Sequence, residues 1–113
     1  MAVFSAPQLS FNAVTPPSSP GETGTIIDLG IIQSGFLLYL VTGGTSSDSG
    51  YAGFDGSLDG TSWYSLTGGE SLVRGGLPPS VQISGVPARY VRANAYTASG
   101  SLVLTASVAG VEL

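Results

Sequence analysis

Residues 54–66 of this chain read FDGSLDGTSWYSL, in which two strand-like segments flank the dipeptide Asp59-Gly60. Asp-Gly is a strong signal for a type I′ hairpin, because that turn needs positive φ at both central positions and Asp-Gly tolerates it. In the segment before the turn, apolar side chains alternate with small or polar ones, as they do along a half-buried strand. The stretch therefore predicts a strand over Tyr51–Leu58, a two-residue turn, and a returning strand over Ser62–Leu66.

Similar strand patterns recur along the rest of the 113 residues, whereas 17 Gly and 7 Pro interrupt every candidate helix. Further strands are expected at Gln8–Val14, Thr25–Leu29, Phe36–Thr42, Val81–Ser84, Arg89–Thr97 and Leu102–Val108. Phe36–Thr42 is apolar on both faces, which predicts a central strand that is covered on both sides. Residues 67–79 are expected to form a long loop. About eight short strands at roughly ten-residue spacing predict an all-β fold, a single-domain antiparallel β-sandwich or jelly roll.

The first 24 residues differ in composition from the rest of the chain. They hold four of the seven prolines and a single charged residue, Glu22. Two structures suit this segment: an edge strand with its connection, or an extended N-terminal arm that lies on a neighbouring subunit. Residues 25–113 are expected to form the β-sandwich domain.

The residue types that the chain lacks exclude whole classes of function. Without Cys and His there is no thiol nucleophile, no Ser-His-Asp triad and no zinc-finger type of metal site. Without Lys there is no Schiff-base chemistry and no P-loop. We therefore expect a protein that is not an enzyme and that has no cofactor and no metal site.

Charge and hydropathy also limit the partners. A net charge of −4 with three Arg disfavours nucleic acid, because binding to phosphates depends on many cationic contacts. The longest apolar run, residues 36–41, is far shorter than the roughly 20 residues of a membrane span. The first residues, MAVFSAPQL, do not resemble a secretory signal, so the protein is expected to be made in the cytoplasm. Charged residues make up only 9% of the chain, against about 25% in typical domains, which predicts a surface covered by other subunits.

The carboxylates are the remaining candidates for chemistry. Asp55 and Asp59 are four residues apart, and such a pair is compatible with glycoside hydrolysis. Together with Asp48 they are also hard oxygen donors of the kind that calcium prefers. The hairpin turn by itself accounts for Asp59, and no calcium-loop spacing is present. We therefore name no catalytic and no metal-binding residue.

Tyr and Arg side chains supply candidate contact residues. Along residues 88–97 one strand face is polar and aromatic and the other is small and apolar. The first face suits either solvent or a protein interface, in which Tyr and Arg are enriched. The candidate interface residues are Phe4, Leu9, Phe11, Tyr90, Arg92, Asn94 and Tyr96. A carbohydrate-binding alternative uses Trp63, Tyr64 and Tyr51, and alternation predicts that one of Trp63 and Tyr64 lies in the core while the other is exposed.

Two segments, FDGSLDGTSWYSL and PARYVRANAYTASGSLVLTASVAG, resemble a small β-sandwich that recurs among virion proteins of tailed bacteriophages. They are also distantly similar to discoidin-type domains that bind carbohydrates and lipids. The resemblance covers roughly residues 51–111. It implies a capsid (head) decoration protein on the outer surface of the virion, a homo-oligomer with a trimer favoured, which binds and stabilises the lattice of the major capsid protein. The alternative that it implies is a carbohydrate-binding, host-adhesion module of a phage tail or fibre.

Overall fold

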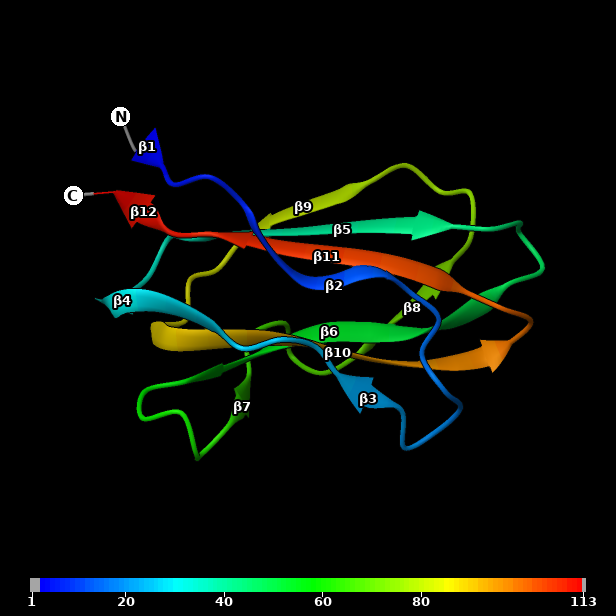
Figure 1. The fold of residues 1–113 in the computed structure, drawn as a ribbon, viewed down its shortest axis with the longest axis horizontal. Helices are drawn as coiled ribbons and strands as arrows, with labels where there is room; N and C mark the ends of the chain where they lie inside the picture. Colours follow the sequence, from blue (N-terminus) through cyan, green and yellow to red (C-terminus); the bar gives the residue numbers. More distant parts are fainter. Residues whose placement is uncertain (1–2, 113) are drawn as a thin grey trace.

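Two antiparallel sheets face each other in the computed structural model, which describes residues 3–112 (Figure 1). The described residues contain strands and no helix. They accordingly include no helix that could cross a membrane. The prediction of an all-β, single-domain antiparallel sandwich is therefore confirmed. A two-stranded piece at one end joins the two ends of the described chain, β1 (Val3–Phe4) with β12 (Val111–Glu112).

The first sheet has four strands in the order β2-β11-β5-β9. Their bounds are Gln8–Val14 for β2, Val103–Ala109 for β11, Leu37–Gly43 for β5 and Ser80–Ile83 for β9. The two edges of this sheet are thus β2, from the beginning of the chain, and β9, which follows the loop at residues 75–79.

The second sheet has six strands around a long central pair, β6 (Ser49–Ser57) and β10 (Ala88–Ser99). Two strands flank β10 on its other side, β3 (Glu22–Thr23) and β4 (Ile27–Gln33). Two more flank β6, β7 (Tyr64–Ser65) and β8 (Ser71–Arg74). In Figure 1 this sheet lies below the four-stranded one.

The core fills the space between the sheets with apolar side chains, many of them small. Alternate residues of β10, Val91, Ala93 and Ala95, are buried and meet the inward-facing residues of β11 and β5. Small residues allow close approach here: a Cβ on Gly56 would lie 2.7 Å from Leu66 Cδ2 and 2.9 Å from Ala88 Cβ. There is therefore no room for a side chain at Gly56 of β6.

The β2 edge of the sandwich is closed by hydrogen bonds between the sheets. The Ser10 hydroxyl donates to the carbonyl of Thr25 and accepts from the amide of Ala93, both at 2.8 Å. The register between β2 and β11 shifts twice, and Ala13 takes a positive φ of 51°. These shifts are β-bulges, which let both Ser10 and Phe11 point inward.

The N-terminal segment is built into the sandwich in this structure. Gln8–Val14, predicted as a strand with these bounds, is β2, an edge strand of the four-stranded sheet, and Glu22–Thr23 pairs with β10. Within this chain the segment thus supplies an edge strand and a connection to the other sheet. Residues 1 and 2 of the predicted arm lie outside the described residues.

Two local predictions were wrong, and both failures have a physical reason. Asp59 does not have positive φ, so the turn is not type I′; β6 ends at Ser57 and β7 begins only at Tyr64. Within the predicted loop at residues 67–79 the structure has the strand β8, which pairs with the first half of β6. This pairing is long-range, and the short SLVR segment carries little pattern of its own.

The prediction for the strand at residues 36–42 is half right. The strand, β5, is central in its sheet, between β11 and β9. Its inward residue Leu38 is buried, but the alternate residues Leu37, Tyr39 and Val41 lie on the outer side of the sheet and are only half-buried. The chain by itself therefore covers one of the two apolar faces of this strand.

Candidate interaction surfaces

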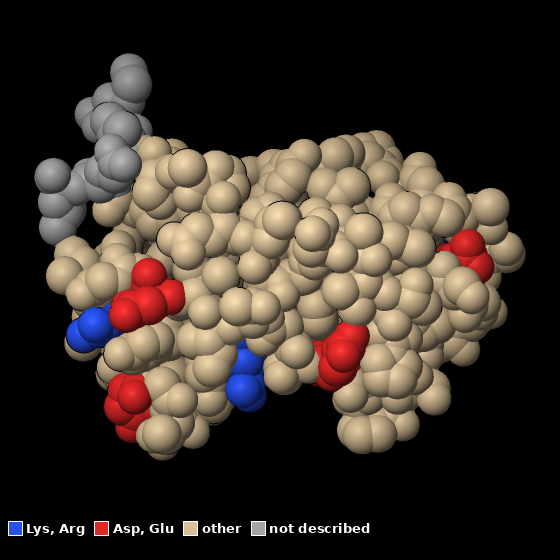
Figure 2. Space-filling view, in the orientation of Figure 1, with Lys and Arg blue, Asp and Glu red and all other residues tan. Residues whose placement is uncertain are grey.

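The outer side of the four-stranded sheet carries no charge. None of the residues of β2, β5, β9 and β11 is Asp, Glu, Lys or Arg. We call this side the uncharged face; its outward side chains are Leu9, Leu37, Tyr39, Val41, Val81, Ile83, Val103, Thr105 and Ser107. In Figure 2 the charged atoms lie in the lower half and at the right-hand end of the view, and the upper rim over β2 and β11 shows none.

The outer side of the six-stranded sheet has the opposite character. It brings together the predicted polar and aromatic residues of β10 with residues of β6 and of the loop after it. We call this side the polar-aromatic face; its members are Tyr51, Asp55, Trp63, Tyr90, Arg92, Asn94 and Tyr96.

Arg92 is the centre of the polar-aromatic face. Its guanidinium lies over the Trp63 ring, 4.0 Å from the ring centroid, and its Nε is 3.6 Å from Asp55 Oδ2. The ion pair is too long for a hydrogen bond, and Nε of Arg92 is buried without a hydrogen-bond partner. One side of the indole ring is therefore occupied by the arginine of the same chain.

A second aromatic group lies further along the same face. Tyr51 and Tyr96 are directly opposite on β6 and β10, and their rings stack with centroids 5.1 Å apart. Asn94 lies two residues before Tyr96 on β10, and its Oδ1 is buried without a hydrogen-bond partner. An aromatic pair beside an unsatisfied amide oxygen is the one feature of this face that resembles a ligand platform.

The loop between β6 and β7 is organised by Asp59. The carboxylate oxygen Oδ1 accepts hydrogen bonds from the amides of Thr61 and Ser62, both at 2.9 Å, and from the Ser57 hydroxyl at 3.0 Å. These bonds, first of all the one from Ser62, hold the pKa of Asp59 well below its ordinary range. Asp59 thus caps its own loop, which is the structural role that turn chemistry predicts for it.

The structure does not bring Asp48, Asp55 and Asp59 together. Asp48 accepts from the amides of Thr45 and Ser101, so it joins the β5–β6 loop to the turn after β10, and these bonds lower its pKa. Within residues 3–112 no group of three or more acidic side chains is placed to hold a metal ion. Each of these carboxylates has a hydrogen-bonding or ion-pairing partner inside the fold.

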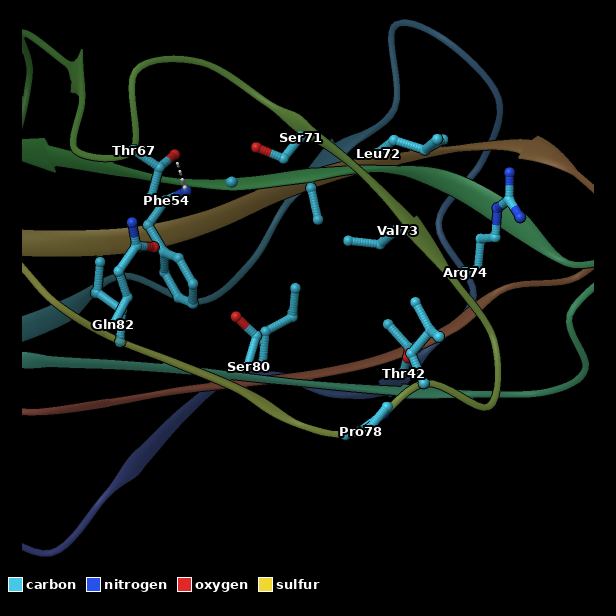
Figure 3. A pocket seen from close by; sticks show the side chains of 15 residues that line it. Thr42, Phe54, Thr67, Ser71, Leu72, Val73, Arg74, Pro78, Ser80 and Gln82 are labelled. Carbon is cyan, nitrogen blue, oxygen red and sulfur yellow. Dashed lines mark hydrogen bonds between the residues drawn. The ribbon is translucent and has the colours of Figure 1, made fainter.

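A cavity of about 260 Å³ lies between the sheets on the side of β8 and β9 (Figure 3). Leu38 and Leu40 of β5 and Phe54 of β6 supply apolar walls, and Ser80 and Gln82 of β9 lie at its edge. The hydroxyl of Thr42 is buried there without a hydrogen-bond partner. The volume is below the roughly 300–1,000 Å³ of ordinary ligand pockets, so we assign no ligand to it. The cavity shows that the two sheets do not pack fully against each other on this side.

The predicted interface residues fall on different parts of the molecule. Tyr90, Arg92, Asn94 and Tyr96 share the polar-aromatic face, while Leu9, which is 45% exposed, lies on the uncharged face of the other sheet. Phe4 is half-buried in β1. Phe11 is 3% exposed and belongs to the core, so in this fold it is not available to a partner.

The predicted glycan-contact residues also separate. Tyr64 packs against the core, its hydroxyl donates to the carbonyl of Pro87, and burial raises the pKa of its phenol. Trp63 points to the polar-aromatic face, as does Tyr51. Sequence reasoning missed the outward residues of β5 and β9, although the uncharged, two-sided apolar pattern of residues 36–42 was a signal for them.

Comparison with known proteins does not assign a family. A scan against protein-family models gives no match, and no curated protein matches the chain significantly. Function is therefore inferred from the two surfaces described above and from the resemblance of residues 51–111.

Proposed function

We propose that this protein is a non-enzymatic virion structural protein, a capsid decoration protein that binds the lattice of the major capsid protein through the uncharged face. The observation that carries the proposal is the complete absence of charge from the four strands of one sheet, beside a second sheet that carries most of the charged residues. The resemblance of residues 51–111 to tailed-phage sandwiches supplies the partner, the location on the outer surface of the head, and the homo-oligomeric state.

The physical reason is the cost of desolvation. Burying charged side chains in an interface is expensive unless each is paired, whereas apolar side chains gain free energy when they are buried. The cores of protein interfaces are accordingly depleted of charge. Leu37, Tyr39 and Val41 form an apolar stripe across the centre of the uncharged face, so docking this face covers the second side of β5. The charged sheet then faces solvent.

Stabilisation follows from position rather than from chemistry. A sandwich seated across adjacent capsid subunits adds buried apolar area to each, and this area must be re-exposed before the subunits separate. The decoration protein thus clamps the shell against the pressure of the packaged DNA. No nucleic acid, membrane or cofactor takes part in this mechanism.

The test measures binding to purified capsids that lack the protein. A Leu9→Lys, Val41→Lys variant places two charges on the uncharged face, and we expect its affinity for capsids to fall at least about tenfold, because a buried unpaired charge costs several kcal/mol. Thr23→Lys adds a charge to the exposed β3 of the other sheet and serves as the matched control, with unchanged binding. Equal binding of both variants, each with wild-type stability, would overturn the proposal.

Truncation is a poor substitute for these point variants. Deleting residues 1–24 removes β2, and with it the buried Phe11 and the hydrogen bonds of Ser10. We expect that the shortened chain loses capsid binding because it loses its fold, which leaves the docking surface untested.

A second candidate function has one observation in its favour, the stacked Tyr51–Tyr96 pair beside the unsatisfied Asn94. Aromatic platforms with nearby hydrogen-bonding groups suit sugar rings, which corresponds to the carbohydrate-binding module of a tail or fibre. A glycan array tests it with Tyr96→Ala. Tyr96 is chosen over Trp63 because the Arg92 guanidinium already covers one side of the Trp63 ring. Binding that disappears in Tyr96→Ala and persists in Leu9→Lys would favour this function over capsid decoration.

A further inference from the structure

The strand β9 is the edge of the four-stranded sheet opposite to β2, and no other described strand pairs with its outer side. It pairs with β5 in unbroken register, and all four of its residues are exposed, Val81 at 58% and Ile83 at 54%. The strand is short, with four residues, but it contains no charge, no proline and no bulge, which are three of the devices by which edge strands avoid pairing with other chains. Its free edge is therefore competent to add another strand.

The hydrogen bonds with β5 show which backbone groups of β9 are free. The amide of Ser84 donates to the carbonyl of Phe36 at 2.9 Å, in register with the four pairs of the strand. In an antiparallel sheet successive residues direct their backbone groups to opposite sides. The backbone N–H and C=O groups of Ser80 and Gln82 therefore point toward β5, like those of Ser84. The backbone N–H and C=O groups of Val81 and Ile83 point away from the sheet.

We propose that two copies of this chain associate by antiparallel pairing of their β9 strands, about a two-fold axis at Gln82. In this register Val81 lies opposite Ile83 of the second copy, and each such pair exchanges two backbone hydrogen bonds. The same pairing places Val81 and Ile83 of both copies side by side on the uncharged face. Each free N–H and C=O of the strand finds a partner, and every new cross-strand contact on that face is apolar.

Neighbouring registers are less favourable. A shift that sets Val81 opposite itself would place Ile83 opposite Pro79, which has no amide hydrogen to donate. The shift in the other direction would place Val81 opposite Gly85, which offers no side chain to contact. Only the register centred on Gln82 satisfies the backbone and pairs the apolar side chains.

The second copy is favoured over other occupants by the character of the sheet itself. A head-to-tail contact would need β2 as the complementary edge, but β2 is bulged and is joined to the other sheet through Ser10. The sheet carries no charge, so joining two of them brings no like charges together despite the net charge of −4. The contact is isologous and closes at two copies.

The proposal goes beyond capsid docking and does not depend on it. Pairing the β9 strands makes one continuous eight-stranded sheet from two four-stranded ones. The uncharged faces of the two copies then form a single, larger face. A trimer, the oligomer that the family resemblance favours, would need a contact other than this one, because an isologous edge pairing has two-fold symmetry.

Disulfide trapping tests the register, and the chain offers a clean background because it has no cysteine. Gln82 meets its own counterpart in a non-hydrogen-bonded pair, with Cα atoms about 4.5 Å apart, which suits a disulfide. We expect oxidised Gln82→Cys to form a covalent dimer. Ser80→Cys is the matched control: its counterpart lies about 13 Å away, too far for a disulfide, so it forms no covalent dimer.

The solution mass tests the contact without any cysteine. We expect the apparent mass of the wild type to double with rising concentration in sedimentation equilibrium. A Val81→Lys, Ile83→Lys variant sets like charges directly opposite each other and weakens dimerisation at least about tenfold. The control Leu9→Lys, Asn12→Lys adds the same charge to exposed residues of β2 and leaves the dimer intact.

Three outcomes would overturn the proposal: a wild type that is monomeric at every concentration, a dimer that survives the β9 lysines, or no disulfide in a dimeric Gln82→Cys. A wild type that is monomeric alone, but loses capsid binding through the β9 lysines and not through Thr23→Lys, would assign the edge to a capsid strand instead. All measurements of mass use the isolated protein. They can therefore succeed when capsid docking fails, or the reverse.

Discussion

The two edges of the four-stranded sheet contrast with each other. At β2 the strand is bulged and Phe11 is buried. The Ser10 hydroxyl there forms hydrogen bonds with the carbonyl of Thr25, between β3 and β4, and with the amide of Ala93 in the opposite sheet. At β9 the strand is regular and exposed, and a cavity of about 260 Å³ separates it from the opposite sheet. One edge is therefore closed within the chain, and the other has the properties of an edge that a partner completes.

The difference shows how irregularity protects a sheet. The bulges in β2 interrupt the backbone ladder and turn two successive side chains inward, so the strand offers no regular ladder to another chain. β9 keeps a regular ladder and two outward apolar side chains. An edge that stays this regular in a chain with so little charge is a place where assembly is expected.

The largest expected effect is the loss of stability on truncating Phe11, which is buried at the closed edge. Phe11→Ala leaves a cavity in the core and is expected to lower the free energy of unfolding by about 3–5 kcal/mol. The matched change on the open edge, Val81→Ala, removes an exposed side chain and should cost less than about 0.5 kcal/mol at concentrations where the protein is monomeric. Urea unfolding of both variants gives the comparison. Similar losses at both edges would contradict the distinction drawn between them.

The second effect removes the hydrogen bonds that close the β2 edge. Ser10→Ala leaves the amide of Ala93 and the carbonyl of Thr25 without their partner, at an expected cost of about 1–3 kcal/mol. Ser80→Ala is the corresponding change on β9, where the side chain is exposed, and should be nearly neutral. A thermal melt distinguishes them. An unchanged melting temperature for Ser10→Ala would show that water replaces the hydroxyl.

The third effect has the opposite sign. The Thr42 hydroxyl lies by the cavity on the open side, buried and without a partner, so it contributes a desolvation cost and no hydrogen bond. Thr42→Val keeps the shape and removes the polar group, and we expect it to raise the free energy of unfolding by about 1 kcal/mol. Destabilisation by this substitution would show that the hydroxyl is hydrated or bonded in solution. Comparison with Ser10→Ala thus separates a satisfied hydroxyl from an unsatisfied one.

Sequence patterns predicted the strands of both edges well and their difference poorly. The alternation in residues 8–14 located β2, and the short β-branched segment at residues 81–84 located β9 to within one residue. The bulges of β2 depend on its register with β11, which lies some 90 residues away in the chain, and no local pattern encodes that register. Alternation alone therefore could not show which edge is closed.

The candidate surfaces were predictable to different degrees. The polar-aromatic face follows directly from alternation along residues 90–96, and the structure places these residues on one face. The uncharged face was not predicted as a site, because it is assembled from four strands that are far apart in sequence. Asp59 shows the remaining difficulty: Asp-Gly suggested a type I′ turn, but the carboxylate binds the amides of its own loop and holds a longer connection.

The smallest expected effect concerns the loop that leads to β9. The amide of Gly75 donates to the carbonyl of Asp48, whose carboxylate accepts from Thr45 and Ser101. These amides lower the pKa of Asp48 from its ordinary value of 3.8, so its contribution to stability is present above that value and is lost as the pH falls toward the lowered pKa. Acidification below about pH 4 should therefore loosen this end of the open edge first.

Hydrogen exchange of the Ser101 amide at neutral and acid pH measures this effect, because that amide is released when Asp48 is protonated. We expect its protection to fall on acidification in the wild type and to be low and independent of pH in Asp48→Asn, which cannot ionise. The Ala93 amide, bonded to Ser10 on the closed edge, has no titrating partner and serves as the internal reference. Equal loss of protection at both amides would mean that acid unfolds the whole sandwich, and the two edges would then not differ in their response to pH.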